Sequence, residues 1–237
     1  PAFHLPGGAV FFFLSLLEIS TNEYLFGVAS TREWVYPTEE AFDIKSSMKR
    51  TLSQLVPQSV KNLYHMGEAV LACLWYGFPG KQLFIIGITG TNGKTTTTQF
   101  VTKILATAGK KVAMASTINF QINDRTWVNA SKFTTMSPWK LQGFLREAVR
   151  QGCEYAVIET SSHALDQNRV WGIPYEIAVM TNVTREHLDY HKTMAAYREA
   201  KCRLFRRARA MVINLDMEDS AFFCGTEKKP TLSYSTK

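Results

Sequence analysis

The chain has 237 residues, of which 46% are hydrophobic and 20% are charged. This composition suits a protein with a sizeable buried core and excludes a disordered or fibrous chain. The formal net charge is +7 at pH 7, and residues 81–237 carry all of the positive excess. Such a charge suits nucleotides, phosphorylated substrates and nucleic acid equally, so it does not choose among these function classes.

Cysteine usage and the longest apolar run give two further constraints. The four cysteines lie far apart and form no C-x-x-C pair. Their spacing argues against a disulfide framework or a zinc ribbon and favours a reducing, cytoplasmic setting. The most apolar stretch, residues 9–17, is far shorter than the roughly 20 residues that span a bilayer. We therefore expect no transmembrane segment.

Residues 1–80 differ in pattern from the rest of the chain. Residues 1–47 show no clean periodicity, and we expect a poorly defined leader there. Residues 48–80 carry apolar side chains at helical spacing, which predicts a helical segment of one or two helices. The sequence Gly77-Phe78-Pro79-Gly80 punctuates its end. A separate domain is expected over residues 81–237.

Short apolar runs alternate with helical patterns in this second part of the chain. The runs predict strands at residues 83–88, 112–115, 155–158, 177–180 and 211–213. The patterns between them predict helices over residues 94–108, 138–150 and 193–207. Because parallel strands need helical crossovers of this length, the sequence predicts an α/β fold with a doubly wound, mostly parallel sheet.

A glycine-rich segment, Gly87 to Thr95, follows the first predicted strand and opens a helix. In this context backbone N–H groups and the helix dipole hold a polyphosphate, as in a P-loop. Lys94 is expected to reach the β- and γ-phosphates, and the Thr95 hydroxyl to coordinate Mg²⁺. The usual P-loop spacing would need glycine at position 88, which is Ile88. The alternative is a glycine-rich turn with a solvated lysine.

Three blocks of sequence resemble the Mur ligases, the ATP-dependent amide ligases of peptidoglycan precursor synthesis. The first is T-G-T-N-G-K-T-T-T at residues 89–97, and the second is E-T-S-S-H-A-L-D-Q-N-R-V at residues 159–170. The third begins T-N-V-T-R-E-H-L-D-Y-H at residue 181, continues to Lys201, and resembles the MurE type, UDP-N-acetylmuramyl-tripeptide synthetase. The resemblance covers about residues 83–216. It implies that residues 81–237 are an incomplete central ATP-binding domain, with the C-terminal domain absent.

The resemblance implies an activity as well as a fold. ATP would phosphorylate the carboxylate of UDP-MurNAc-L-Ala-D-Glu, and an amino acid would attack the acyl phosphate to form an amide. The implied cofactors are ATP and Mg²⁺. The implied setting is cell wall biogenesis in the cytoplasm, with consequences for cell shape and cell division, and the expected state is a monomer.

The same resemblance assigns the candidate site residues. Nucleotide binding is expected at Gly90, Thr91, Asn92, Gly93, Lys94, Thr95 and Thr96. Binding of the UDP-MurNAc substrate is expected at Thr134, Thr135, Ser161, Gln167 and Arg169. Metal binding is expected at Thr95, Glu159, His187 and Lys201, the last after carboxylation by CO₂. The catalytic residues implied are Lys94, Glu159, His187 and Lys201.

One residue departs from the family pattern, and the basic residues near Lys201 have a second interpretation. Many relatives have proline directly after the two threonines, whereas this chain has Met136. Without the resemblance, Lys201 would be taken for a solvated helix lysine. The arginines that follow it are expected on a solvated helix face: Arg203, Arg206, Arg207 and Arg209.

Other functions remain open from the sequence. A folylpolyglutamate or cyanophycin synthetase would share the P-loop but usually lacks the third block. A truncated module could bind nucleotide or UDP-substrate without turnover. Nucleic acid is not expected as a partner, because basic and aromatic residues are not interleaved.

Overall fold

The computed structural model describes residues 57–130, 133–225 and 228–236. Residues 56–237 form one compact unit. The leader predicted at residues 1–47 lies outside the described residues. Of the helical segment predicted over residues 48–80, residues 48–56 also lie outside the described residues. The described remainder holds the helix α3 (Gln58–Tyr76), which ends at Gly77 in the left-handed conformation (φ 69°). A 3₁₀ turn, η1 (Pro79–Gln82), follows it.

An eight-stranded sheet forms the centre of this unit, in the order β4-β3-β2-β5-β1-β6-β7-β8. The strands are β1 (Phe84–Thr89), β2 (Val112–Ala115), β3 (Asn119–Ile122), β4 (Arg125–Val128), β5 (Tyr155–Glu159), β6 (Tyr175–Met180), β7 (Ala210–Asn214) and β8 (Thr231–Tyr234). The pairs β2–β3 and β3–β4 are antiparallel, and the other pairs are parallel. The predicted mostly parallel sheet is confirmed, and the β3–β4 hairpin and β8 are additions to it.

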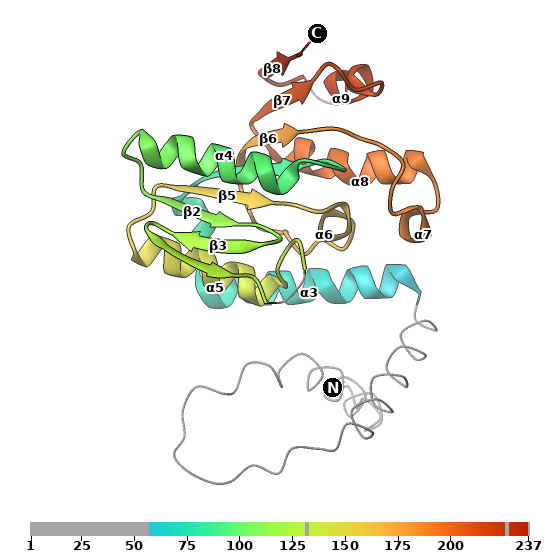
Figure 1. The fold of residues 1–237 in the computed structure, drawn as a ribbon. Coiled ribbons are helices and arrows are strands. Elements are labelled where there is room, and N and C mark those ends of the chain that lie inside the picture. Colours follow the sequence, from blue (N-terminus) through green and yellow to red (C-terminus); the bar gives the residue numbers. More distant parts are fainter. Residues whose placement is uncertain (1–56, 131–132, 226–227, 237) are drawn as a thin grey trace, which may run out of the picture. The chain divides into compact units, whose positions relative to one another are not determined.

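Helices cover both faces of the sheet (Figure 1). The helices after α3 are α4 (Lys94–Thr107), α5 (Pro138–Arg150), α6 (Ser162–Asp166), α7 (Leu188–His191), α8 (Met194–Arg207) and α9 (Ser220–Gly225). Helices α5 and α8 pack on one face of the sheet, where side chains such as Leu145, Leu204 and Phe205 are buried. The other face packs Val101 and Leu105 of α4. Burial on both faces explains why the central strands are almost continuously apolar.

The chain reverses direction across the sheet at its central strand. β1 lies between β5 and β6. After β1 the chain crosses through α4 to β2 on one side, and after β5 it crosses to β6 on the other side. The carboxyl ends of β1, β5 and β6 therefore meet where open α/β sheets bind their ligands.

Gly87 lies inside β1 and takes part in packing. A Cβ atom there would lie 2.7 Å from the ring of Tyr175 and 2.9 Å from Leu204 Cδ1. Real Cβ atoms do not approach neighbours so closely, so only glycine fits beneath these side chains. Gly87 thus belongs to the core of the sheet, and Gly90 and Gly93 are the glycines of the loop that follows.

None of the helices in the described part of the chain is both long enough and apolar enough to cross a membrane.

Replacing Gly87 by alanine should destabilise the fold by about 1–3 kcal/mol, the usual cost of overpacking a core. The matched control is Gly67→Ala in α3, where a Cβ atom would meet nothing within 4 Å. That change should stabilise the chain by about 0.5–1 kcal/mol, because alanine is the better helix former. Urea unfolding of both variants measures the two effects, and equal effects would contradict the packing role of Gly87.

Candidate active site

The loop after β1 passes very close to the end of β6. A Cβ atom on Gly90 would lie 1.8 Å from Thr181 Oγ1, so no side chain fits there. Asn182 holds the loop from the other side: its carbonyl oxygen accepts the Thr91 N–H at 2.9 Å, and its Oδ1 accepts the Asn92 N–H at 2.8 Å. The loop is therefore fixed to the segment at the end of β6 by hydrogen bonds to Asn182, and the close approach of Thr181 tolerates only glycine at position 90.

The first turn of α4 is arranged to receive an anion. Gly93 is the N-cap in the left-handed conformation (φ 78°), and no side chain caps the helix. The first N–H groups of a helix have no intrahelical acceptor and lie at the positive end of the helix dipole. Lys94 Nζ donates to the Thr91 carbonyl oxygen at 2.7 Å and thus lies over the loop. These residues fit the phosphates of a nucleotide.

Glu159 ends β5 and is almost completely buried. Both of its carboxylate oxygens accept hydrogen bonds. Thr95 Oγ1 donates at 3.0 Å, the Thr117 N–H at 2.8 Å and the Thr117 hydroxyl at 2.9 Å. Thr117 is not among the residues predicted from the sequence, although it follows β2 at the same edge of the sheet. Thr95 and Glu159, two of the residues predicted to bind Mg²⁺, are therefore in direct contact.

A carboxylate and a hydroxyl oxygen are ligand types that Mg²⁺ prefers. No group of three or more His, Cys, Asp or Glu side chains in the described part of the chain could hold a metal ion alone. Mg²⁺ usually keeps several waters and binds through one or two carboxylates together with substrate phosphates. Thr95 and Glu159 beside an anion-binding loop fit that mode of binding.

Lys201 is buried, with 1% of its surface exposed. Its Nζ donates to the Gly90 carbonyl oxygen at 2.7 Å and lies 4.4 Å from the centre of the Tyr197 ring. Burial, with a smaller contribution from the charge of Lys94, lowers the pKa of Lys201 to about 7. The interpretation of Lys201 as a solvated helix lysine is thus wrong, because α8 turns this position toward the phosphate loop.

The two threonines of the 133–138 loop occupy different positions. Thr134 lines the cleft described below. Thr135 is buried, and its hydroxyl donates to the Glu159 carbonyl oxygen at 3.1 Å and accepts the Ser161 N–H at 2.9 Å. Arg169 Nη1 donates to the Thr135 carbonyl oxygen at 3.0 Å. The loop is thereby attached to the segment that follows β5.

Arg169 has donor capacity left over. Its Nε is buried and has no hydrogen-bond partner among the described residues. Burial lowers the pKa of its guanidinium. A half-buried cation whose buried Nε is an unused donor favours an anionic ligand that would compensate both.

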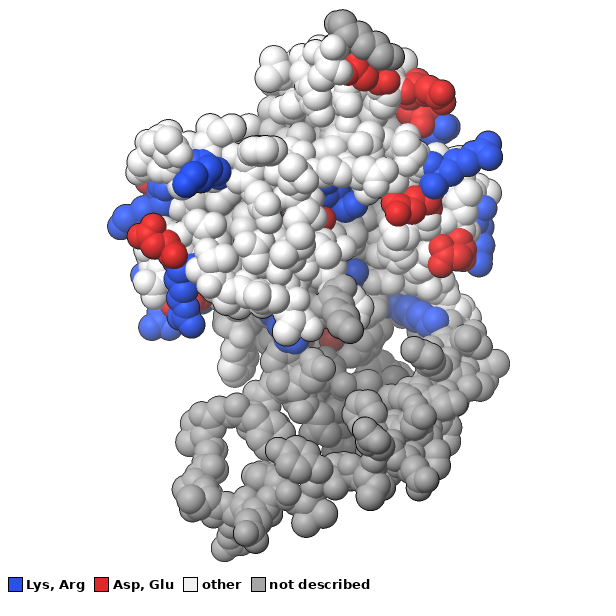
Figure 2. All heavy atoms as spheres, in the orientation of Figure 1, with Lys and Arg blue, Asp and Glu red and all other residues white. Residues whose placement is uncertain are grey.

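Several of the residues described above line a cleft of about 620 Å³. Eight of the predicted residues line it: Gly90, Lys94, Thr134, Ser161, Gln167, Arg169, His187 and Lys201. His65 and Glu68 of α3 line it too, and no sequence signal pointed to them. The other predicted residues are not among those that line it. In the loop and the first turn of α4, Asn92, Gly93 and Thr96 are exposed, Thr95 is half-buried and Thr91 is buried; Thr135 in the 133–138 loop and Glu159 at the end of β5 are buried. On the face shown in Figure 2, Lys and Arg are interspersed with Asp and Glu.

His187 precedes α7 and adopts the left-handed conformation (φ 56°). Its ring meets that of His163 edge to face, with centroids 4.9 Å apart. Burial and the charges of His187, His191 and Arg169 lower the pKa of His163 to about 4. His163 is therefore neutral at pH 7 and adds no charge beside His187.

The sequence predicts that the four arginines in and after α8 lie on a solvated face. The structure confirms this for only two of them. Arg203 and Arg207 are half-buried. Arg203 forms an ion pair with Asp166, and Arg207 donates to Asn168 Oδ1 at 3.0 Å. Arg206, paired with Glu199, and Arg209 are exposed as expected.

Comparison with known proteins gives a consistent result. Residues 88–237 match the Mur ligase middle domain. The chain is 39% identical over 198 residues to the UDP-N-acetylmuramoyl-L-alanyl-D-glutamate--2,6-diaminopimelate ligase of Geobacillus thermodenitrificans, covering 80% of this chain and 40% of the relative. It is 46% identical over 139 residues to the UDP-N-acetylmuramyl-tripeptide synthetase of Roseiflexus sp., covering 58% and 27%.

Solved structures agree on the fold. One UDP-N-acetylmuramoyl-L-alanyl-D-glutamate--2,6-diaminopimelate ligase superimposes with a TM-score of 0.59 at 36% identity, covering 65% of this chain and 32% of that one. E. coli FolC in complex with DHPP and ADP gives a TM-score of 0.57 at 15% identity, covering 76% and 51%, which shows a shared fold alone. This chain spans about 40% of the length of the first curated relative.

Two structural features agree with the match over residues 88–237. They are the loop that leads into the uncapped start of α4 and the buried Glu159 at the end of β5. The chain belongs to the Mur ligase family, and its similar curated relatives are of the MurE type.

Proposed function

We propose that this chain is part of an ATP-dependent amide ligase that adds an amino acid to UDP-MurNAc-L-Ala-D-Glu in peptidoglycan precursor synthesis. Residues 81–237 would be its central ATP-binding domain, preceded by the helical segment 48–80. The setting would be cytoplasmic and the chain a monomer. The ligases named among its relatives support this proposal.

One observation carries the proposal. The cleft is lined both by Gly90, Lys94 and the buried Lys201, and by Ser161 and Arg169 from the segment after β5. The first group would form a nucleotide end and the second group a second, cationic end. A ligase that phosphorylates a carboxylate must hold two anionic ligands next to each other. A chain that only hydrolysed nucleotide would not need the second end, whose Arg169 Nε has no partner in the described residues.

The residues of the chain would divide the work between the two ends. Lys94 and the first amides of α4 would bind the β- and γ-phosphates. Arg169, with Ser161, Gln167, Thr134 and Thr135, would hold the UDP-MurNAc substrate. This arrangement brings the carboxylate and the γ-phosphate together and offsets their mutual repulsion with fixed cations.

Thr95, Glu159, His187 and Lys201 would hold Mg²⁺. Bound there, Mg²⁺ would neutralise charge on the phosphates and polarise them. Lys201 would serve in a carboxylated form. Its pKa of about 7 leaves much of the amine neutral at pH 7, and a neutral amine adds to the carbon of CO₂ with release of one proton. The product is an anion, which suits a cation-binding site better than an ammonium group.

Calorimetric titration of the chain with UDP-MurNAc-L-Ala-D-Glu, in the presence of Mg²⁺ and a non-hydrolysable ATP analogue, tests the proposal. Saturable binding of the muropeptide is expected, and no binding of a folate added in its place. Binding of folate but not of muropeptide would favour a folylpolyglutamate synthetase. Binding of nucleotide alone would contradict a muropeptide site in this chain.

Single substitutions should separate the two ends of the cleft. Lys94→Ala should weaken binding of the ATP analogue at least 100-fold, because a cation is lost from the phosphates. Arg169→Ala should leave nucleotide affinity within threefold and weaken muropeptide binding at least tenfold. Calorimetry of both variants with both ligands measures this, with Lys103→Ala in α4 as an exposed control. Equal effects of both changes on both ligands would reject the assignment.

The buried amine of Lys201 should make stability depend on pH. Its pKa is about 7 in the folded chain and about 10.4 when unfolded. Between these values the unfolded chain binds more protons, so the free energy of unfolding should rise with pH from about 7 toward 10, by at most about 1.4 kcal/mol per pH unit. Urea unfolding in CO₂-free buffers should show this rise in the parent and in Lys103→Met, but not in Lys201→Met. Parallel curves for all three proteins would contradict the assignment.

A further inference from the structure

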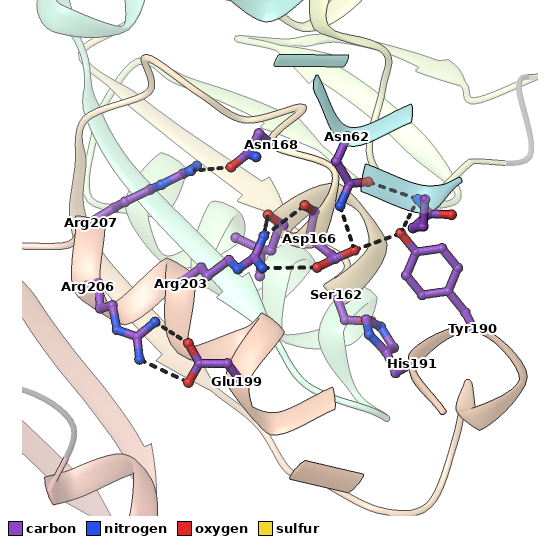
Figure 3. Close-up of polar contacts among 12 residues, drawn as sticks. Asn62, Ser162, Asp166, Asn168, Tyr190, His191, Glu199, Arg203, Arg206 and Arg207 are labelled. Atoms are coloured by element: carbon purple, nitrogen blue, oxygen red, sulfur yellow. Dashed lines mark hydrogen bonds and ion pairs between the residues drawn. The ribbon is translucent and has the colours of Figure 1, made fainter. Parts of the chain in front are cut away.

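Two side-chain hydrogen bonds join the short helix α7 to the short helix α6 (Figure 3). The Tyr190 hydroxyl donates to Asp166 Oδ2 at 2.8 Å. His191 Nε2 lies 3.0 Å from Ser162 Oγ. Ser162 and Asp166 are the first and last residues of α6, one helical turn apart on the same face. We call these four residues the α6–α7 clamp.

Helix α7 depends on such contacts because its own backbone is unfavourable. It has four residues, too few for a helix that is stable by itself. Non-glycine residues with positive φ flank it on both sides: His187, in the left-handed conformation (φ 56°), and Lys192 (φ 66°). Such conformations persist only where surrounding structure imposes them. In the described structure, α6 supplies two such side-chain anchors, Ser162 and Asp166.

Asp166 is the centre of a wider network, seen in Figure 3. Arg203 of α8 neutralises its carboxylate through an ion pair at 3.1 Å, and also donates to its carbonyl oxygen at 2.8 Å. From α3, Asn62 Nδ2 donates to Asp166 Oδ2 at 3.2 Å, and Gln58 Nε2 donates to the Tyr190 hydroxyl at 2.9 Å. The network therefore connects α3, α6, α7 and α8.

The Tyr190 hydroxyl is a dependable donor in this network. Burial and the hydrogen bond to Asp166 raise the pKa of Tyr190 to about 12. The phenol therefore keeps its proton at any pH at which the chain would work. A hydrogen bond from a neutral donor to an ionised acceptor is among the stronger ones in proteins.

The clamp connects the two ends of the cleft. α6 starts directly after Ser161 and leads into Gln167 and Arg169, while α7 starts directly after His187. The ring of His163, on α6, lies between the two helices, 4.2 Å from the centroid of Tyr190 and 4.9 Å from that of His187. A shift of α7 against α6 would therefore move His187 relative to Arg169.

We propose that the α6–α7 clamp is a positioning device that holds His187 at a fixed place relative to Arg169, and that Asp166 and Tyr190 are its principal positioning residues. The role of His187 toward a divalent cation rests on the proposed function. The hold of the clamp on residues 187–192 does not, so the two can fail separately.

The test uses Tyr190→Phe, which removes one hydroxyl and keeps the ring, and Asp166→Asn, which removes the charge and keeps the shape. In the ligand-free chain, hydrogen–deuterium exchange of the amides of residues 190–192 should accelerate about tenfold in each, the scale of one hydrogen bond to a charged acceptor. Binding of Mn²⁺ to the complex with the non-hydrolysable ATP analogue, followed by electron paramagnetic resonance, should weaken about tenfold. Metal-free affinity for the ATP analogue should stay within twofold.

Two control variants match these changes. Tyr155→Phe removes a hydroxyl at the start of β5, where the ring packs on Phe84 at the opposite edge of the sheet. Glu199→Gln removes a carboxylate of α8 that pairs with the exposed Arg206. Neither should change exchange or Mn²⁺ affinity.

The outcomes are distinguishable. Unchanged exchange in both Tyr190→Phe and Asp166→Asn would overturn the clamp. Faster exchange with unchanged Mn²⁺ affinity would overturn the positioning role and leave only a structural one. A parent chain that bound neither nucleotide nor muropeptide would refute the proposed function, and the exchange rates would then decide the clamp by themselves.

Discussion

The site depends first on one buried carboxylate. Removing the charge of Glu159 from water is costly unless hydrogen bonds replace the lost solvation, and Thr95 and Thr117 supply them on both oxygens. Thr95 belongs to the first turn of α4 and Thr117 follows β2. A single charge at the end of β5 therefore fixes where α4 begins and where the chain leaves β2. Close packing of Gly90 against Thr181 fixes the end of β6 in the same way.

The central part of the fold follows directly from the sequence. Strands buried on both faces are continuous apolar runs, so β1, β2, β5, β6 and β7 were predicted to within two residues at each end. The prediction lacks the β3–β4 hairpin, although two adjacent turn-forming residues, Asn123 and Asp124, lie between two short runs of alternating side chains. Helices α6 and α7 could not be predicted, because four or five residues show no period and tertiary hydrogen bonds hold them.

The site was predictable where a residue's chemistry follows from its place on the chain. Lys94 opens a helix after a strand and Glu159 ends one, and both lie where those positions imply. The burial of Lys201 follows from no local pattern, because its environment comes from Gly90 and Tyr197. Family resemblance identified this lysine, and the geometry supplies the physical reason for its unusual pKa.

Helix α3 has more than a connecting role. It packs beside the sheet domain, places His65 and Glu68 in the wall of the cleft, and reaches Asp166 and Tyr190 through Asn62 and Gln58. None of its residues belongs to the three blocks that carry the resemblance. Since Glu68 contributes a negative charge near Arg169, the cationic end of the cleft is set partly by a segment outside the matched middle domain.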